Sequence, residues 1–285
     1  MELNFLILDA NSELVIGYCR EIMGLDGEVR SDENSSFPKL ELKQFVFAKQ
    51  FKEYLCQHKE SISRLVYICI IDKNKQTIGR YSFSIDDDIY NHKIGFHEEP
   101  TDICWSGLLD EVISDFEIQI WNQWKVSSPS KKGEWAKLSE DGRRAWLKVV
   151  KNYNFTKPLE CSGTPKHEAT YYLDGTYVTD YPSFFCAIGE AVNGPGGYYG
   201  FDISSLIDCL HGGFGADAPF ILIWKHHQIA RAHLDTHSWI KEIQYKRIIN
   251  DKLFEQPEFE ELGDRPLFEA LIEVIKDQGV LILFE

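Results

Sequence analysis

One short stretch of the chain places three polar side chains at positions i, i+4 and i+7: Ser204, Asp208 and His211. On a helix of 3.6 residues per turn, these three side chains share one face. A carboxylate on an outward face can form charge-assisted hydrogen bonds with a cationic partner. Tyr198 and Tyr199 stand just before the stretch, so the sequence indicates a polar contact surface with aromatic residues beside it.

A glycine-rich loop, NGPGGYYG, leads into this stretch. Its glycines supply left-handed conformations and Pro195 fixes one φ angle, so helix is broken sharply and the loop holds one shape. The spacing then predicts a short helix with Asp202 as its N-cap and with Gly212 and Gly213 as its end. The core-facing stripe of this helix is Ile203, Leu206, Ile207 and Leu210.

A histidine cluster is the second group of residues with chemical potential. His233 and His237 are four residues apart, so one helical face could present both imidazoles to a zinc ion, but the sequence specifies no third ligand. The chain has no G-x-S-x-G, P-loop, G-x-G-x-x-G or H-E-x-x-H pattern. The sequence therefore predicts no catalytic residue, no metal and no cofactor. A zinc enzyme is the least favoured alternative, and it would be built on His226, His227, His233, Asp235 and His237.

The C-terminal part of the chain alternates short apolar runs with helical patterns. Strands are predicted at 169–173, 220–224 and 280–284, and further helices at 181–192 and 266–278. The continuous apolar run FILIW is typical of a strand that is covered on both faces. Strands joined by helices in this order predict an α/β fold with a three-stranded parallel sheet and helical crossovers.

The order of these motifs resembles the barstar family, small acidic proteins that block the active sites of secreted ribonucleases. The order is YYLDG, a helix, GPGGYYG, DCL, FILIW and a last helix that runs into GVLILFE. The resemblance implies inhibition of a ribonuclease by occupation of its substrate cleft. Residue by residue, it assigns the family's loop to Tyr198, Tyr199 and Gly200, its polar N-cap to Asp202, and its principal contacting aspartate to Asp208, where an RNA phosphate would bind.

The chain also departs from the best-known member of that family. Ser204 stands where that member has a second contacting aspartate, and Ile207 stands where it has a tryptophan. Glu273 lies one position from the place of a contacting glutamate in the last helix, and His211 lies at the edge of the surface. Because Ser204 stands in place of a second acid, we expect a partner whose cleft is less basic than usual, or is met by other acids of this chain.

The charge balance favours a basic protein as the partner. The 285-residue chain has a formal net charge of −15, and residues 161–285 hold 19 acidic and 9 basic side chains. A binder of phosphate backbones needs Lys and Arg, so direct nucleic-acid binding is not expected. A short basic patch at 131–151 indicates a solvated amphipathic helix.

Seven cysteines without a C-x-x-C pair predict small buried side chains in a reducing compartment. The start lacks a basic region followed by an apolar core, and the chain has no apolar run long enough to span a membrane. We therefore expect a cytoplasmic protein that does not contact a membrane.

The first half of the chain predicts a separate α+β domain. Its firmest feature is a hairpin formed by two β-rich runs, 64–72 and 77–85. A strand is predicted at 4–8 and helices at about 42–58 and 105–124, whereas 12–23 fits a strand or a helix. Residues 134–152 fit one helix, or two short helices with a break at Gly142. The acidic triplet 86–88 indicates a solvated loop.

These observations predict an α+β domain of unassigned family at residues 1–155, a linker at 156–166 and a barstar-like domain at 167–285. The expected function is inhibition of a cognate ribonuclease, in an immunity protein that neutralises a cytotoxic nuclease toxin. The alternative is an immunity or interaction protein whose N-terminal domain binds the partner and whose barstar-like domain is a scaffold. In neither case is the protein expected to be an enzyme.

Overall fold

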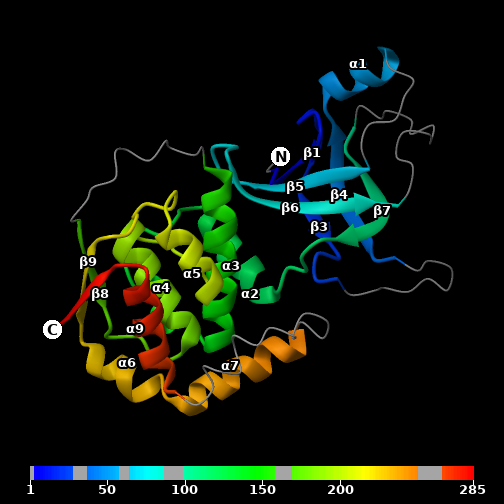
Figure 1. Ribbon diagram of the computed structural model, residues 1–285. Helices are drawn as coiled ribbons and strands as arrows, with labels where there is room; N and C mark the ends of the chain where they lie inside the picture. Colours follow the sequence, from blue (N-terminus) through cyan, green and yellow to red (C-terminus); the bar gives the residue numbers. More distant parts are fainter. Residues whose placement is uncertain (1–2, 28–36, 58–63, 87–98, 158–168, 250–264) are drawn as a thin grey trace. The chain divides into compact units, whose positions relative to one another are not determined.

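The computed structural model describes residues 3–27, 37–57, 64–86, 99–157, 169–249 and 265–285 (Figure 1). The contacts of the chain divide it into two compact units, Met1–Ser128 and Pro129–Glu285. The expected linker at 156–166 lies almost wholly outside the described residues, and the helix before it belongs to the second unit. The protein is a mixed α/β chain with an antiparallel sheet in the first unit and a parallel sheet in the second.

Within its described residues, the N-terminal unit is built on a seven-stranded sheet in the order β2-β1-β5-β6-β7-β4-β3. An additional pairing of β2 with β4 closes this sheet on itself, with Ile7, Ile16 and Phe83 fully buried in the unit. The predicted hairpin is confirmed as β5 and β6, which pair in an antiparallel register. The strands are β1 (Phe5–Asp9), β2 (Val15–Cys19), β3 (Glu21–Met23), β4 (Lys39–Phe47), β5 (Leu65–Ile71), β6 (Thr77–Ile85) and β7 (Thr101–Leu109).

Strand β4 occupies the first part of the helix that was predicted at 42–58, and the helix α1 (Lys49–Gln57) forms only after it. The cause is a bulge in the strand. The pairing of β4 with β7 shifts register around Gln44, whose φ angle is 53°. One extra residue turns the alternation of a strand into a spacing of three, which imitates the apolar period of a helix.

The prediction of one helix over 105–124 is also wrong in its first half. Strand β7 continues to Leu109, and the helix α2 (Asp115–Trp124) starts six residues later. Ser114 is the N-cap of α2 and forms a capping box with Glu117. The capping box marks a helix start in the sequence, but apolar residues at helical spacing lie on both sides of Ser114, so the spacing predicted one continuous helix.

The C-terminal unit is built on a parallel sheet of three strands among its described residues, in the order β10-β9-β8. The strands are β8 (Thr170–Asp174), β9 (Ile221–Lys225) and β10 (Leu281–Phe284). The helical elements are η1 (Glu134–Lys137), α3 (Glu140–Thr156), α4 (Tyr181–Asn193), α5 (Ile203–Leu210), α6 (His227–His233), α7 (Thr236–Ile249) and α9 (Leu267–Asp277). This architecture confirms the predicted small parallel sheet with helical crossovers.

The described helices of this unit cover one face of the sheet (Figure 1). Leu173 and Trp224 point into the core and have no exposed surface, whereas Tyr172 and Leu281 on the other face are 54% and 55% exposed. The expectation that the central strand β9 is covered on both faces is therefore wrong for the described residues. Ile223 is half-buried between its neighbours on β8 and β10.

Helix α3 and the 3-10 helix η1 pack on α4, so they belong to the body of this unit. Asp180 caps α4 in a capping box with Ser183, and Pro182 occupies the first turn as predicted. No helix in the described parts of the chain is long and apolar enough to cross a lipid bilayer.

Candidate functional site

Helix α5 begins at a fully formed cap. The Asp202 Oδ1 atom accepts hydrogen bonds from the Ser205 amide at 2.8 Å and from Ser205 Oγ at 2.7 Å. The Asp202 amide in turn donates to Ser205 Oγ at 3.0 Å, which completes a capping box. The carboxylate of Asp202 is therefore occupied in the helix start, as the predicted N-cap role requires.

The outward face of α5 carries the three polar side chains that the sequence placed there. Ser204, Asp208 and His211 are exposed, whereas Leu206 on the opposite face is fully buried. Among the residues that the structure describes, the Asp208 carboxylate has no hydrogen-bond or ion-pair partner. His211 Nδ1 lies 2.8 Å from the Ile207 carbonyl oxygen, so this nitrogen donates and Nε2 is left as the second polar atom of the ring.

Tyr198 and Tyr199 lie inside the unit and do not present their rings to solvent. Tyr199 has no exposed surface, and its hydroxyl donates to the Ala216 carbonyl oxygen at 2.8 Å. Tyr198 is 6% exposed, and its ring centroid lies 5.8 Å from that of Phe214. Burial raises the pKa of both hydroxyls, so both stay neutral at physiological pH. The two rings, which the sequence placed beside the polar contact surface, pack the loop against the body of the unit.

Glycines let the loop pack backbone against backbone. Gly200 has a φ angle of 89°, and a Cβ atom there would lie 2.9 Å from the Leu206 amide nitrogen of α5. A Cβ atom at Gly197 would lie 2.6 Å from the Gly189 carbonyl oxygen of α4. Larger side chains would force these segments apart, so the glycines fix the start of α5 close to α4.

The buried carboxylate of Glu190 on α4 connects the glycine-rich loop to Gly133, near the start of the C-terminal unit, through hydrogen bonds. Glu190 is 4% exposed; its Oε2 atom accepts from the Gly133 amide at 2.7 Å, and its Oε1 atom accepts from the Gly196 amide at 3.4 Å. Burial raises the pKa of Glu190 above its ordinary value of 4.5, although the two amide hydrogen bonds act in the opposite direction.

A pH-dependent stability of the loop follows from Glu190. Because its pKa is higher in the folded than in the unfolded protein, the associated stabilisation is complete below about pH 4.5 and is lost as the pH rises through the folded pKa. Glutamine does not titrate, so the free energy of unfolding of Glu190→Gln, relative to wild type, should increase from about pH 4 to about pH 7. Urea unfolding at both pH values measures this difference. A difference that stays constant or decreases contradicts the role given to Glu190.

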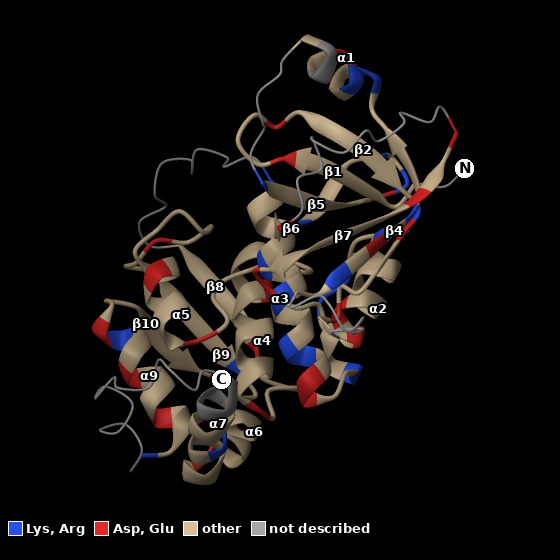
Figure 2. Cartoon of the chain, turned by 90° about the vertical axis from the view of Figure 1, so that its right-hand side faces the viewer, with Lys and Arg blue, Asp and Glu red and all other residues tan. Residues whose placement is uncertain are grey.

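Glu273 lies on α9, a helix that packs against α5. Its exposed carboxylate pairs with Arg265, and Glu269 on the same helix pairs with Arg231 at 3.1 Å. Acidic positions mark both α5 and α9 in Figure 2. These two acids of α9 already have arginine partners, whereas Asp208 has none among the described residues.

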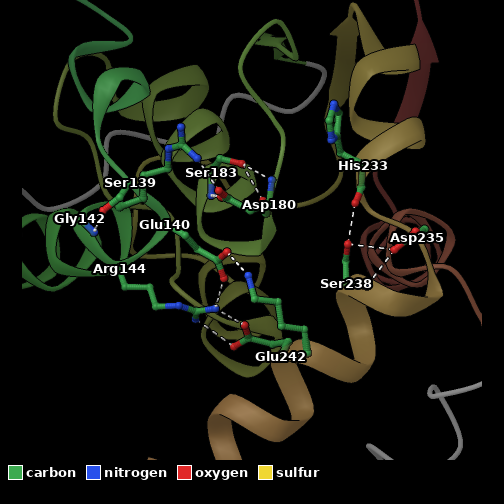
Figure 3. Close-up of polar contacts among 12 residues, drawn as sticks. Ser139, Glu140, Gly142, Arg144, Asp180, Ser183, His233, Asp235, Ser238 and Glu242 are labelled. Carbon is green, nitrogen blue, oxygen red and sulfur yellow. Dashed lines mark hydrogen bonds and ion pairs between the residues drawn. The ribbon is translucent and has the colours of Figure 1, made fainter.

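The histidine cluster does not form the helical face that its spacing predicted. His233 ends α6 and Thr236 begins α7, so His233 and His237 belong to different helices. Asp235 accepts from the Ser238 amide at 2.8 Å, and Ser238 Oγ donates to the His233 carbonyl oxygen at 2.6 Å (Figure 3). The Ser238 amide lowers the pKa of Asp235. No group of three or more possible metal ligands occurs within the described ranges.

The two arginines of the basic patch pair with acids inside the C-terminal unit. Arg143 pairs with Asp180, the N-cap of α4. Arg144 lies between Glu140 and Glu242, with Nη2 at 2.9 Å from Glu140 Oε1 and 2.5 Å from Glu242 Oε2 (Figure 3). Sequence reasoning missed the second pair because Glu242 lies 98 positions away. These positions therefore do not form a free basic face.

Sequence reasoning also missed that α3 reaches the loop. The ring centroid of Phe155 lies 6.2 Å from that of Tyr198, and Lys151 Nζ lies 4.9 Å from the ring centroid of Phe201. Lys151 and Phe155 are four residues apart, so they share one face of α3. The spacing predicts this shared face of α3, but nothing in the sequence indicates that the face packs against the loop before α5.

The fold and the site together define a class of protein domain: a small parallel sheet with helical crossovers that holds a short helix with an exposed carboxylate, which has no partner among the residues that the structure describes. Residues 168–245 match the family Barstar, described as barnase inhibitor. The C-terminal part of the chain is thus a barstar-family domain, which confirms the resemblance found in the motifs. No curated protein and no solved structure gave a significant match.

Proposed function

We propose that the C-terminal unit inhibits a ribonuclease by placing the outward face of α5 in the enzyme's substrate cleft. The observation that carries this proposal is the environment of the Asp208 side chain. Its carboxylate is exposed and has no partner among the described residues, and it lies on a helix whose start is fixed by a capping box and by close loop packing. A ribonuclease cleft binds phosphate with cationic groups, so a carboxylate can take the place of that phosphate.

The other residues of the site have distinct roles in this proposal. Ser204 and His211 flank Asp208 on the same face and offer a hydroxyl and a ring nitrogen as hydrogen-bonding groups. Asp202 and Gly200 set the position of the helix, and the buried Tyr198 and Tyr199 support the loop. Because Ser204 is neutral, Asp208 supplies the charge at the centre of the face.

The acidic chain also suits a basic partner in solution. Opposite net charges steer two proteins together and raise the association rate, an effect that added salt weakens. The formal net charge of −15 supports this part of the proposal. A cell that makes a cytotoxic ribonuclease, or meets one, needs an inhibitor of this kind, so we infer that the protein acts as an immunity protein against a nuclease toxin.

Retention followed by an activity assay tests the proposal. The full chain is immobilised, and a ribonuclease is isolated from cells that encode the chain; we call this enzyme the retained ribonuclease. Cleavage of a fluorescent RNA is then followed while the full chain is titrated in. The proposal expects cleavage to stop at about one equivalent of chain, as tight binding of one cleft by one helix face requires. If no retained protein cleaves RNA, or if cleavage continues with excess chain, the proposal is wrong.

A further inference from the structure

Exposed aromatic side chains gather beside the candidate site. Phe155, near the end of α3, is 64% exposed, and Phe201, directly before the N-cap of α5, is 38% exposed. Phe214, which follows α5, is half-buried. We call these three residues the aromatic rim. Phe155 and Phe214 are in ring contact, and Lys151, one turn before Phe155 on α3, lies over the ring of Phe201. Single exposed apolar residues are common on proteins, whereas exposed apolar residues that gather in one region are typical of an interaction surface.

The aromatic rim is held together by contacts within the C-terminal unit. The ring centroid of Phe155 lies 6.4 Å from that of Phe214 and 6.2 Å from that of the buried Tyr198. Asn193 Nδ2 donates to the Tyr198 carbonyl oxygen at 2.6 Å and to the Phe214 carbonyl oxygen at 2.8 Å, so it ties the loop before α5 to the segment after it. Phe155 and Phe214 are therefore held by ring contacts and Phe201 by Lys151, which limits the conformational freedom that these side chains lose on binding.

The position of the rim connects it to the face of α5. Phe201 is adjacent in sequence to Asp202, and the same loop carries Tyr198 beneath Phe155. A ribonuclease that covers Asp208 would therefore reach this edge of the unit. Helix α3 lies before residues 168–245, which match the barstar family, so Phe155 is outside the matched range.

The charge beside the rim limits what can bind there. Lys151 Nζ already lies over the ring of Phe201, at 4.9 Å from its centroid. A second cation on that ring would be repelled by Lys151, so basic side chains of a ribonuclease do not suit this position. Apolar side chains do suit it, because exposed phenylalanine surface gains free energy when it leaves water.

We propose that the aromatic rim binds an apolar shelf that borders the basic cleft of the partner ribonuclease. This inference rests on the proposed function and adds a second contact to it. The partner then has a defined surface: cationic groups opposite Asp208, and aliphatic or aromatic side chains opposite Phe155 and Phe201. The apolar contact supplies part of the binding free energy that an acidic residue would supply at position 204, where this chain has Ser204.

The retained ribonuclease tests the aromatic rim through Phe155→Ala, Phe155→Leu and a matched control, Tyr172→Ala. Tyr172 is 54% exposed and lies on the sheet face opposite the helices, so its truncation removes exposed aromatic surface far from α5. We expect Phe155→Ala to weaken binding about tenfold, mainly through faster dissociation, and Phe155→Leu to keep most of the affinity. Tyr172→Ala should bind as wild type does. Thermal unfolding of each variant verifies the fold.

Two results would separate this inference from the proposed function. If Phe155→Ala binds like Tyr172→Ala while Asp208→Ala loses inhibition, the aromatic rim is not a contact and the role of α5 stands. If Asp208→Ala inhibits as wild type does, the proposed function fails and the inference fails with it.

Discussion

Asp208→Ala is expected to weaken binding of the retained ribonuclease by about 30- to 5,000-fold, which corresponds to the loss of about 2–5 kcal/mol when one partner of a buried charge pair is truncated. The barnase–barstar pair is one of the complexes on which this general range rests, and its measured values extend above the range. The physical reason is that the cationic groups of the cleft lose water on binding and then lack the carboxylate that compensates them. Surface plasmon resonance and the RNA cleavage assay measure the effect.

The fold of this variant should be unchanged, because the Asp208 side chain is exposed and has no partner among the described residues. Asp277→Ala is the matched control, since it removes one exposed acid from the neighbouring helix α9. Only long-range attraction is lost in that control, so its affinity should fall about twofold at most in physiological salt. If both variants bind equally well, α5 does not enter the cleft, and recognition by the N-terminal unit becomes the better account.

Arg144→Met is expected to destabilise the C-terminal unit by about 3–5 kcal/mol, the cost of removing one member of a buried ion pair. Glu242 is 2% exposed, and both of its carboxylate oxygens accept from Arg144, at 3.2 and 2.5 Å. The guanidinium also lies 3.8 Å from the ring centroid of Tyr245. Without Arg144 the Glu242 carboxylate stays buried and loses this partner. Differential scanning calorimetry should show the unit melting about 6–20 °C lower.

Two further variants show whether burial is the cause. Arg231 forms a pair of the same type with Glu269, but both side chains are about half exposed, so Arg231→Met should cost no more than about 1 kcal/mol. The double variant Arg144→Met, Glu242→Met leaves no uncompensated charge and should be more stable than Arg144→Met alone. If Arg144→Met and Arg231→Met lower the free energy of unfolding equally, the assignment of Arg144 to a buried ion pair that joins α3 to α7 is wrong.

The C-terminal unit could be predicted well because local sequence signals agree with its tertiary structure. The Asp202 cap, the glycine-rich loop and the apolar period of α5 all favour the same helix, and the structure forms it at residues 203–210. The outward positions of Ser204, Asp208 and His211 follow directly from that helix. The strands of the parallel sheet were equally readable, since each is a short apolar run between turns.

Other features depend on packing that the sequence does not display. The bulge at Gln44 converts a strand pattern into a helical spacing, so periodicity alone could not assign β4. Tyrosines beside a polar face suggest anchors, but Tyr199 has a partner at Ala216 that only the folded loop brings within reach. The contacts of α3 with the loop, and the pair of Arg144 with Glu242, likewise join distant segments.

The most direct measurement of the central claim is competition between the chain and substrate for the retained ribonuclease. The apparent inhibition constant of the full chain is determined at increasing concentrations of a non-cleavable oligoribonucleotide. If the face of α5 occupies the cleft, the apparent constant should rise linearly with the concentration of the oligoribonucleotide and should not level off, and no complex of all three molecules should form. An inhibition constant that does not change with oligoribonucleotide concentration, or a stable complex of all three, would contradict binding in the cleft.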